Sequence, residues 1–279
     1  MFLAALMLSA AAVMCSCRHG GVQDAADSAF MTTVIERADS ADSALQCKIR
    51  ADYPTGHDTL SLAVRRFVCA QLASNYLPQM NCPDSAEAYP LYAGSTGKGG
   101  DVVDYYVGGT LSFLKGQAAE MLRYGSRQPM SYDLSVTLSA DTVNYLSYEV
   151  KSYAYLGGAH GSAADYTVNI AKPSGNVLSQ TVDTLKVKAL QPVLRKGVLG
   201  YLRGNGADYI NEHNLTEYLF VSDGIIPLPA HAPYLAADGV HFVYQQYEIG
   251  PYAMGMVSFT VPYDEIKPYL TEEALRLMQ

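Results

Sequence analysis

YDLSVTLSADTVNYLSYEVKSYAYLGGAHGSAADYTVNI, residues 132–170, is the stretch of sequence that decides the fold. Apolar and polar residues alternate within it in three successive runs, at 132–139, 143–155 and 165–170, and short turns separate the runs. A period of two indicates a strand with one buried face. Consecutive strands joined by short turns pair antiparallel, so the stretch predicts a three-stranded meander.

The sequence before this meander predicts one further strand and two helices. Residues 47–53 alternate between apolar and polar and are followed by turn residues. Apolar residues then recur at spacings of three and four over 60–72 and again over 102–124, which is typical of helices with one buried face. A loop rich in Pro, Gly and Ser, residues 81–100, separates the two helices.

The sequence after the meander predicts a mixture of short elements. A third helix is expected over 191–203, two further strands over 240–249 and 254–261, and a short helix from Tyr263. Helices and strands are interspersed without regular beta-alpha-beta alternation. We therefore expect an α+β fold, with helices packed on one face of a mainly antiparallel meander sheet.

Composition excludes several classes of protein. The 279 residues are 49% hydrophobic and 16% charged, which is typical of a folded globular chain rather than of a disordered segment or a coiled coil. The formal net charge is -8, and the 19 Lys and Arg residues are scattered. Because no basic stripe is available to follow a phosphate backbone, we do not expect nucleic acid as a partner.

The N-terminal residues predict export. Residues 2–14, FLAALMLSAAAVM, are too short to span a bilayer but have the length of the hydrophobic region of a signal peptide. A cysteine directly after such a segment resembles a bacterial lipoprotein signal. Cys17 is the expected lipidation site because the small Ser16 precedes it, whereas Cys15 follows the bulky Met14. An ordinary cleaved secretory peptide is the alternative.

Lipidation would attach the chain to a membrane through acyl chains. Arg18, directly after Cys17, resembles lipoproteins that are sent on to the outer membrane. The expected location is therefore the cell envelope, as an outer-membrane lipoprotein facing either the periplasm or the cell surface. The predicted division of the chain is a lipoprotein signal peptide at 1–16, a flexible tether at 17–43, an N-terminal α+β part at 44–130 and a C-terminal domain at 131–279.

The motifs of common catalytic and metal sites do not occur in the sequence. The six histidines lack metal-ligand spacing, and Gly97-Lys98 lacks the other residues of a phosphate-binding loop, so we expect neither a metal nor a cofactor. His160, Ser162 and Asp165 are neighbours only along the chain, and no catalytic residue is assigned. Three cysteines of the body, Cys47, Cys69 and Cys82, allow at most one disulfide, whose pairing is left open.

Two segments resemble a known family. These are YAYLGGAHG at 153–161 and ADGVHFVYQQYEIGPYAMG at 237–255, the latter followed by FTVPYDEIKPYL at 259–270. They are similar to the C-terminal domain of the RsiV-like family, in which a membrane anti-sigma factor senses lysozyme. The same domain occurs beside peptidoglycan deacetylases and in lipoproteins of unassigned function.

The resemblance implies a sensing or binding domain without the segments that carry the signal or the catalytic activity in its relatives. A complete anti-sigma factor of this family has a cytoplasmic sigma-binding segment and a transmembrane helix, and deacetylase relatives have a separate catalytic domain; we expect neither here. The leading hypothesis is a cell-envelope lipoprotein with a non-catalytic binding domain for lysozyme or a peptidoglycan fragment. The candidate ligand-binding residues are Tyr155, His160, Tyr247 and Tyr252, at the two bends.

Two alternatives remain open. One is a hydrolase that acts on cell-wall material, with His160 and Asp165 as candidate residues, and it requires His160 to line a pocket beside a perturbed carboxylate. The other is a structural envelope protein without a small ligand, for which a flat surface poor in tyrosine would be expected.

Overall fold

A computed structural model of the chain describes residues 29–42, 44–81 and 88–279. The chain first forms β1 (Thr32–Asp42), β2 (Leu45–Pro54), α1 (Thr59–Ser74), α2 (Leu77–Asn81), α3 (Gly99–Arg123), β3 (Met130–Asp141), β4 (Tyr145–Tyr155) and β5 (Ser162–Ala171). It continues with α4 (Val187–Gly204), β6 (Tyr234–Ala236), β7 (Gly239–Val243), β8 (Ser258–Val261), α5 (Tyr263–Ile266) and α6 (Glu272–Leu277), with short 3-10 turns between them.

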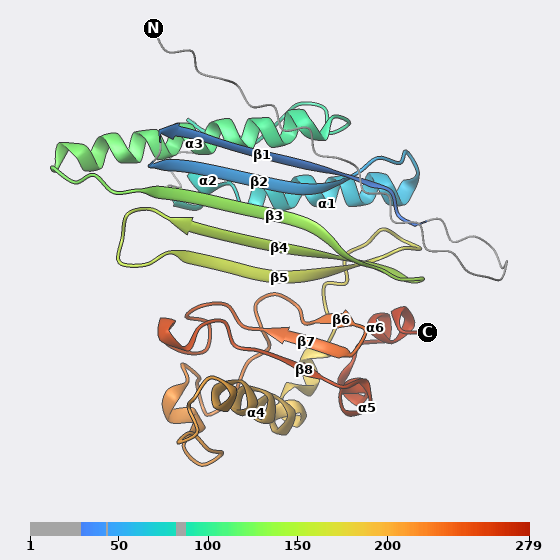
Figure 1. The fold of residues 1–279 in the computed structure, drawn as a ribbon. Helices are drawn as coiled ribbons and strands as arrows, with labels where there is room; N and C mark the ends of the chain where they lie inside the picture. The colour runs from blue at the N-terminus through green and yellow to red at the C-terminus, as the bar shows by residue number, and fades with distance from the viewer. Residues whose placement is uncertain (1–28, 43, 82–87) are drawn as a thin grey trace, which may run out of the picture.

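The first sheet contains five strands in the order β1-β2-β3-β4-β5 (Figure 1). Strands β3, β4 and β5 form the predicted antiparallel meander, with Val136 opposite Val150 and Val150 opposite Tyr166. Strand β2 runs parallel to β3, because the chain crosses over through α1, α2 and α3 between them. The α+β class is thus confirmed, and the sheet is mainly antiparallel.

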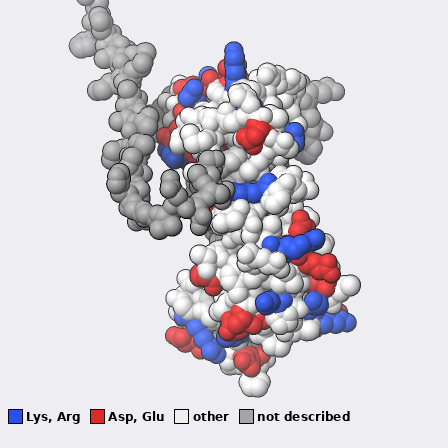
Figure 2. Space-filling model, turned by 90° about the vertical axis from the view of Figure 1, so that its right-hand side faces the viewer, with Lys and Arg blue, Asp and Glu red and all other residues white. Residues whose placement is uncertain are grey.

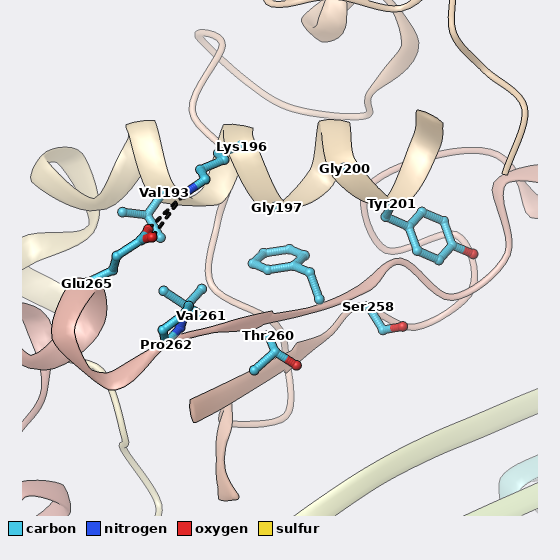
Figure 3. A pocket seen from close by; sticks show the side chains of 11 residues that line it. Val193, Lys196, Gly197, Gly200, Tyr201, Ser258, Thr260, Val261, Pro262 and Glu265 are labelled. Carbon is cyan, nitrogen blue, oxygen red and sulfur yellow. Dashed lines mark hydrogen bonds and ion pairs between the residues drawn. The ribbon is translucent and has the colours of Figure 1, made fainter. Parts of the chain in front are cut away.

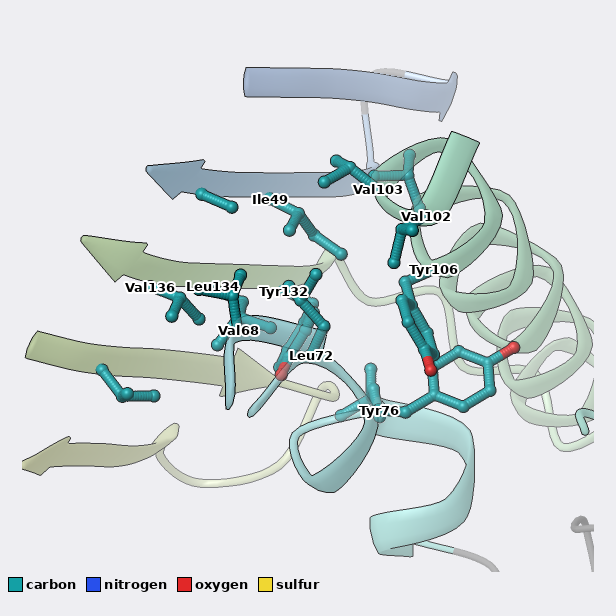
Figure 4. Close-up of a cluster of buried hydrophobic side chains, with 14 of the residues drawn as sticks. Ile49, Val68, Leu72, Tyr76, Val102, Val103, Tyr106, Tyr132, Leu134 and Val136 are labelled. Carbon is teal, nitrogen blue, oxygen red and sulfur yellow. The ribbon is translucent and has the colours of Figure 1, made fainter. Parts of the chain in front are cut away.

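Helices α1 and α3 cover one face of this sheet. Alternate residues of β2 and β3 are buried, and their side chains meet those of α1 and α3 in one core (Figure 4). Tyr132 and Val136 of the sheet, and Leu72 and Val103 of the helices, are almost fully inaccessible to solvent. Helix α1 begins at Thr59, and the carboxylate of Asp58 caps it by accepting a hydrogen bond from the Ser61 amide at 2.9 Å.

The prediction of a flexible tether over 17–43 is wrong for residues 32–42, which form strand β1. Residues 32–42 lie within the range 17–43 that composition assigned to a flexible segment, yet they form the edge strand of the sheet, with Thr33 opposite Tyr53. Most of the strand is solvent-exposed, including Val34, so it shows no alternation of buried and exposed residues. The predicted signal peptide, Cys17 and the first part of the predicted tether lie outside the described residues.

The second sheet contains three strands in the order β6-β7-β8, with α4 packed against β8 (Figure 1). Its core is separate from the first and includes Leu194, Leu235 and Phe242, as well as Tyr145 and Ala171 from the end of the first sheet. The change from one core to the other therefore falls after β5. The predicted boundary between residues 130 and 131 does not coincide with it, because β3 to β5 share the sheet and the core of the preceding elements.

The described helices are all too short or too polar to cross a membrane. Cys47 and Cys69 are both free thiols, and Cys82 lies outside the described residues. On the face shown in Figure 2, positive and negative side chains are interspersed, and neither sign forms a continuous patch.

Candidate functional site

Three of the four candidate residues come together in space. The ring of His160 stacks on that of Tyr252 with centroids 3.9 Å apart and an interplanar angle of 24°. Tyr247 lies beside both, 6.4 Å from His160 and 5.6 Å from Tyr252 between ring centroids. We call His160, Tyr247 and Tyr252 the bend cluster, since one residue comes from the bend between β4 and β5 and two come from the connection between β7 and β8.

Backbone contacts hold the bend cluster in place. The Tyr252 hydroxyl donates to the carbonyl oxygen of Gly161 at 3.0 Å, and Nδ1 of His160 lies 3.0 Å from the same oxygen. A Cβ on Gly161 would lie 2.4 Å from the ring of Tyr153, so a side chain there would displace that ring. Gly157 supplies a positive φ of 80° at the start of the bend.

Tyr247 is an exposed member of the bend cluster. Its residue exposure is 55%, and its φ of 65° is unusual for a bulky residue. Such a backbone conformation costs on the order of 1–3 kcal/mol and occurs most often at functional sites. The chain thus holds a large aromatic ring toward solvent at a conformational cost.

Tyr155 lies apart from the bend cluster. Its hydroxyl donates to the carbonyl oxygen of Gly158 at 3.0 Å, which closes the bend locally. Within the described residues it makes no ring contact with His160, Tyr247 or Tyr252.

The connection that carries Tyr247 also joins the two sheets. The side chain of Gln245 accepts a hydrogen bond from the backbone N–H of Asp165 at 3.0 Å and donates one to its backbone carbonyl at 2.8 Å. It therefore makes the two hydrogen bonds that a neighbouring strand would make at the edge of β5. Asn169 binds the amide and carbonyl of Leu235 in β6 in the same way, at 2.6 and 3.1 Å. These contacts cover two sheet edges and fix the bend cluster relative to both sheets.

A groove of about 500 Å³ lies where the two sheets meet. Glu149 and Asp165 line it from the first sheet, and Tyr234, His241 and Thr260 line it from the second. We call it the junction groove. Tyr234 faces His241 across β6 and β7, and His241 faces Thr260 across β7 and β8, so these three side chains form a single row.

The row continues into a hydrogen-bonded chain. Nε2 of His241 lies 2.7 Å from a carboxylate oxygen of Asp238, and Nδ1 lies 3.1 Å from the hydroxyl of Tyr234. A carboxylate only accepts hydrogen bonds, so Nε2 of His241 donates to Asp238, and Nδ1 shares the second hydrogen bond with the Tyr234 hydroxyl. The arrangement orients the Tyr234 hydroxyl at the groove.

Burial determines the electrostatics of the junction groove. Burial raises the pKa of Asp165, and the nearby Lys151 ammonium, 3.7 Å away, partly opposes this shift. Lys151 also contacts Glu149 at 2.6 Å. Burial likewise raises the pKa of Tyr234.

The structure does not bring the hydrolase candidates together. His160 stacks on Tyr252 in the bend, whereas the Asp165 side chain pairs with Lys151 and its backbone with Gln245. The perturbed carboxylate lines the junction groove with His241 rather than His160. Among the described residues, no group of three or more His, Cys, Asp or Glu residues has the geometry to hold a metal ion.

Asp165 is a candidate residue of the hydrolase alternative, but the other residues of the junction groove were not predicted as site residues. One sequence signal could have found part of the groove. Asp238-Gly239 is a strong turn signal, and a tight turn there places Tyr234 opposite His241. Nothing in the sequence indicates that Glu149 and Asp165, on another sheet, face this pair.

Comparison with protein families places a domain of unassigned function in the second part of the chain. Residues 183–264, which run from the turn before α4 into α5, match the family described as "Protein of unknown function (DUF3298)". No curated protein matches the chain.

Two crystal structures share the fold. One is a member of the DUF3298 family from Bacteroides fragilis, 19% identical, with a TM-score of 0.60, covering 88% of this chain and 94% of its own. The other is a DUF3298 family protein from Pseudomonas aeruginosa, 15% identical, with a TM-score of 0.55, covering 88% of this chain and 96% of its own. At these identities the likeness concerns the fold alone.

Proposed function

We propose that this chain is a cell-envelope lipoprotein whose domain binds an extracytoplasmic ligand without catalysing a reaction. The observation that carries the proposal is the bend cluster, in which Tyr247 is held in a strained backbone conformation and exposed to solvent. Exposed tyrosines contribute much of the binding energy at protein interfaces and also stack on sugar rings, because an apolar ring ends in a polar hydroxyl.

The ligand candidates are lysozyme and a peptidoglycan fragment. The RsiV-like segments at 153–161 and 237–255 support lysozyme, and they contain all three residues of the bend cluster. The junction groove adds hydroxyl, imidazole and carboxylate groups that fit a sugar. In both cases the ligand would contact the two bends that the structure places side by side.

A structural envelope protein is less well supported. That alternative predicts a surface poor in tyrosine, yet Tyr124, Tyr153, Tyr209, Tyr218 and Tyr247 are all exposed.

A calorimetric titration of the purified chain with c-type lysozyme, and in parallel with solubilised muropeptides, tests the proposal. Saturable binding of either ligand supports it and identifies the ligand class. A flat response to both, with the protein folded by circular dichroism, contradicts it.

A further inference from the structure

Strand β8 is an edge strand of the second sheet, and among the described residues it pairs with β7 alone. The Tyr244 amide donates to the Val257 carbonyl at 2.9 Å, directly after the strand pairing ends. Along an antiparallel ladder, opposite residues that exchange backbone hydrogen bonds alternate with opposite residues that do not. Since Val257 bonds to β7, the backbone groups of Phe259 and Val261 also bond to β7. The backbone groups of Ser258 and Thr260 therefore point away from β7.

These outward groups have no partner. Within the described residues, the N–H and C=O of Ser258 and Thr260 make no hydrogen bond to backbone or side chain. The other edges of this region are covered, since Gln245 binds the edge of β5 and Asn169 binds that of β6. The edge of β8 thus differs from its neighbours in being left open.

A groove of about 390 Å³ runs between β8 and α4 (Figure 3). Helix α4 contributes Gly197 and Gly200 to the lining of this groove, so at these two positions no side chain of the helix lies between helix and strand. A Cβ on Gly197 would meet the ring of Phe259 at 2.2 Å, whereas a Cβ on Gly200 would meet nothing within 4 Å. Gly197 permits the close packing, and Gly200 leaves the groove open.

The ends of the groove are fixed by side-chain contacts. At one end, Lys196 of α4 pairs with Glu265 of α5 at 2.9 Å. At the other, the Tyr201 hydroxyl donates to the carbonyl oxygen of Met254 at 3.1 Å. The four residues of β8 between them span about 13 Å at the usual rise of a strand.

The composition of β8 also differs from that of the other exposed edge. Strand β1 carries Glu36, Arg37 and Asp39, and charges on an edge strand oppose the addition of another strand. Strand β8, SFTV, has no charged residue. Because the open edge of β8 is uncharged and lies beside a groove, it can accept the backbone of another strand.

We propose that β8 accepts an extended polypeptide segment as an added strand. The partner's backbone would pair with the N–H and C=O groups of Ser258 and Thr260, and alternate partner side chains, small or apolar, would enter the groove beside Gly200. This surface is distinct from the bend cluster, and the inference does not depend on the proposed ligand.

Selection from a phage-displayed library of random dodecapeptides on the immobilised chain tests the inference. Gly200→Leu places a side chain in the groove at a position where a Cβ meets nothing within 4 Å, and Ser258→Pro removes an outward N–H while leaving the bonds to β7 intact. Gly108→Leu is the matched control, because Gly108 is also an exposed helical glycine with nothing within 4 Å of a Cβ, but it lies in α3.

We expect selected peptides to alternate apolar residues and to bind the wild type and Gly108→Leu equally. Both test variants should weaken binding at least tenfold, and bound peptide should slow hydrogen exchange of the Ser258 and Thr260 amides at least tenfold. Failure to enrich any peptide overturns the inference. So does a set of peptides whose binding is the same for all three variants, or that leaves these two amides unprotected.

Discussion

The ring of His160 lies stacked on the ring of Tyr252 at 3.9 Å, and this contact joins the bend between β4 and β5 to the connection that leads into β8. Since the first bend belongs to the five-stranded sheet and the second to the three-stranded sheet, the bend cluster forms only when both sheets are assembled.

Gly161→Ala should destabilise the fold. The added Cβ would lie 2.4 Å from the Tyr153 ring, and we expect a loss of about 1–3 kcal/mol in the free energy of unfolding, measured by urea denaturation. Gly158→Ala is the control, because its Cβ would be 4.0 Å from the nearest atom. Equal stability of the two variants would show that the Tyr153 ring does not pack on Gly161.

Asn169→Ala should weaken the contact between the two sheets. Asn169 is buried, and its removal leaves the Leu235 amide and carbonyl in β6 without partners. We expect a loss of about 1–3 kcal/mol in unfolding free energy. Asn176→Ala, at an exposed asparagine, should change stability by less than about 0.5 kcal/mol. If Asn169→Ala also changed stability by less than about 0.5 kcal/mol, the contact between Asn169 and Leu235 would not stabilise the fold.

His231 should make stability depend on pH. Its ring stacks on Tyr166 at 3.7 Å, and burial lowers its pKa in the folded state. The unfolded chain, with a pKa of about 6.5, then binds more protons between the two pKa values. The contribution of His231 is therefore present above about pH 6.5 and lost as the pH falls toward the depressed folded pKa.

His231→Phe retains an aromatic ring against Tyr166 and removes the titration. The free energy of unfolding of the wild type, measured from pH 5 to pH 8, should rise more steeply with pH than that of the variant. Identical pH dependence of the two proteins would contradict the lowered pKa of His231.

Lipidation at Cys17 should be detectable by metabolic labelling with an alkyne fatty acid in a bacterial host. The wild type and Cys15→Ser should incorporate the label and fractionate with membranes, because the signal places the modified cysteine after Ser16. Cys17→Ser should lose both properties. Label that persists in Cys17→Ser would rule out this residue as the anchor.

The meander and the helices were predictable because their residues alternate with periods that match one buried face. Strand β1 was not, because most of its residues are exposed and its sequence lacks any buried period. The strand predicted over 240–249 ends at Val243, since the following residues turn so that Gln245 can bind the edge of β5. Such long-range pairing leaves no local pattern.

The candidate site was predictable in part, because some of its residues lie in bends that the local sequence marks. The glycines around His160 and Tyr252 mark bends, and bends expose side chains. The junction groove depends on the meeting of two sheets, and neither the spacing nor the composition of Asp165 and His241 indicates that they face one groove.

The most direct test of the account is the dissociation constant of c-type lysozyme, or of the muropeptide if that is the ligand bound, for Tyr247→Ala. Tyr124→Ala is the matched control, since Tyr124 is an even more exposed tyrosine, directly after α3. We predict at least a tenfold higher dissociation constant for Tyr247→Ala and no change for Tyr124→Ala. Wild-type affinity in Tyr247→Ala would contradict the claim that the bend cluster binds the ligand.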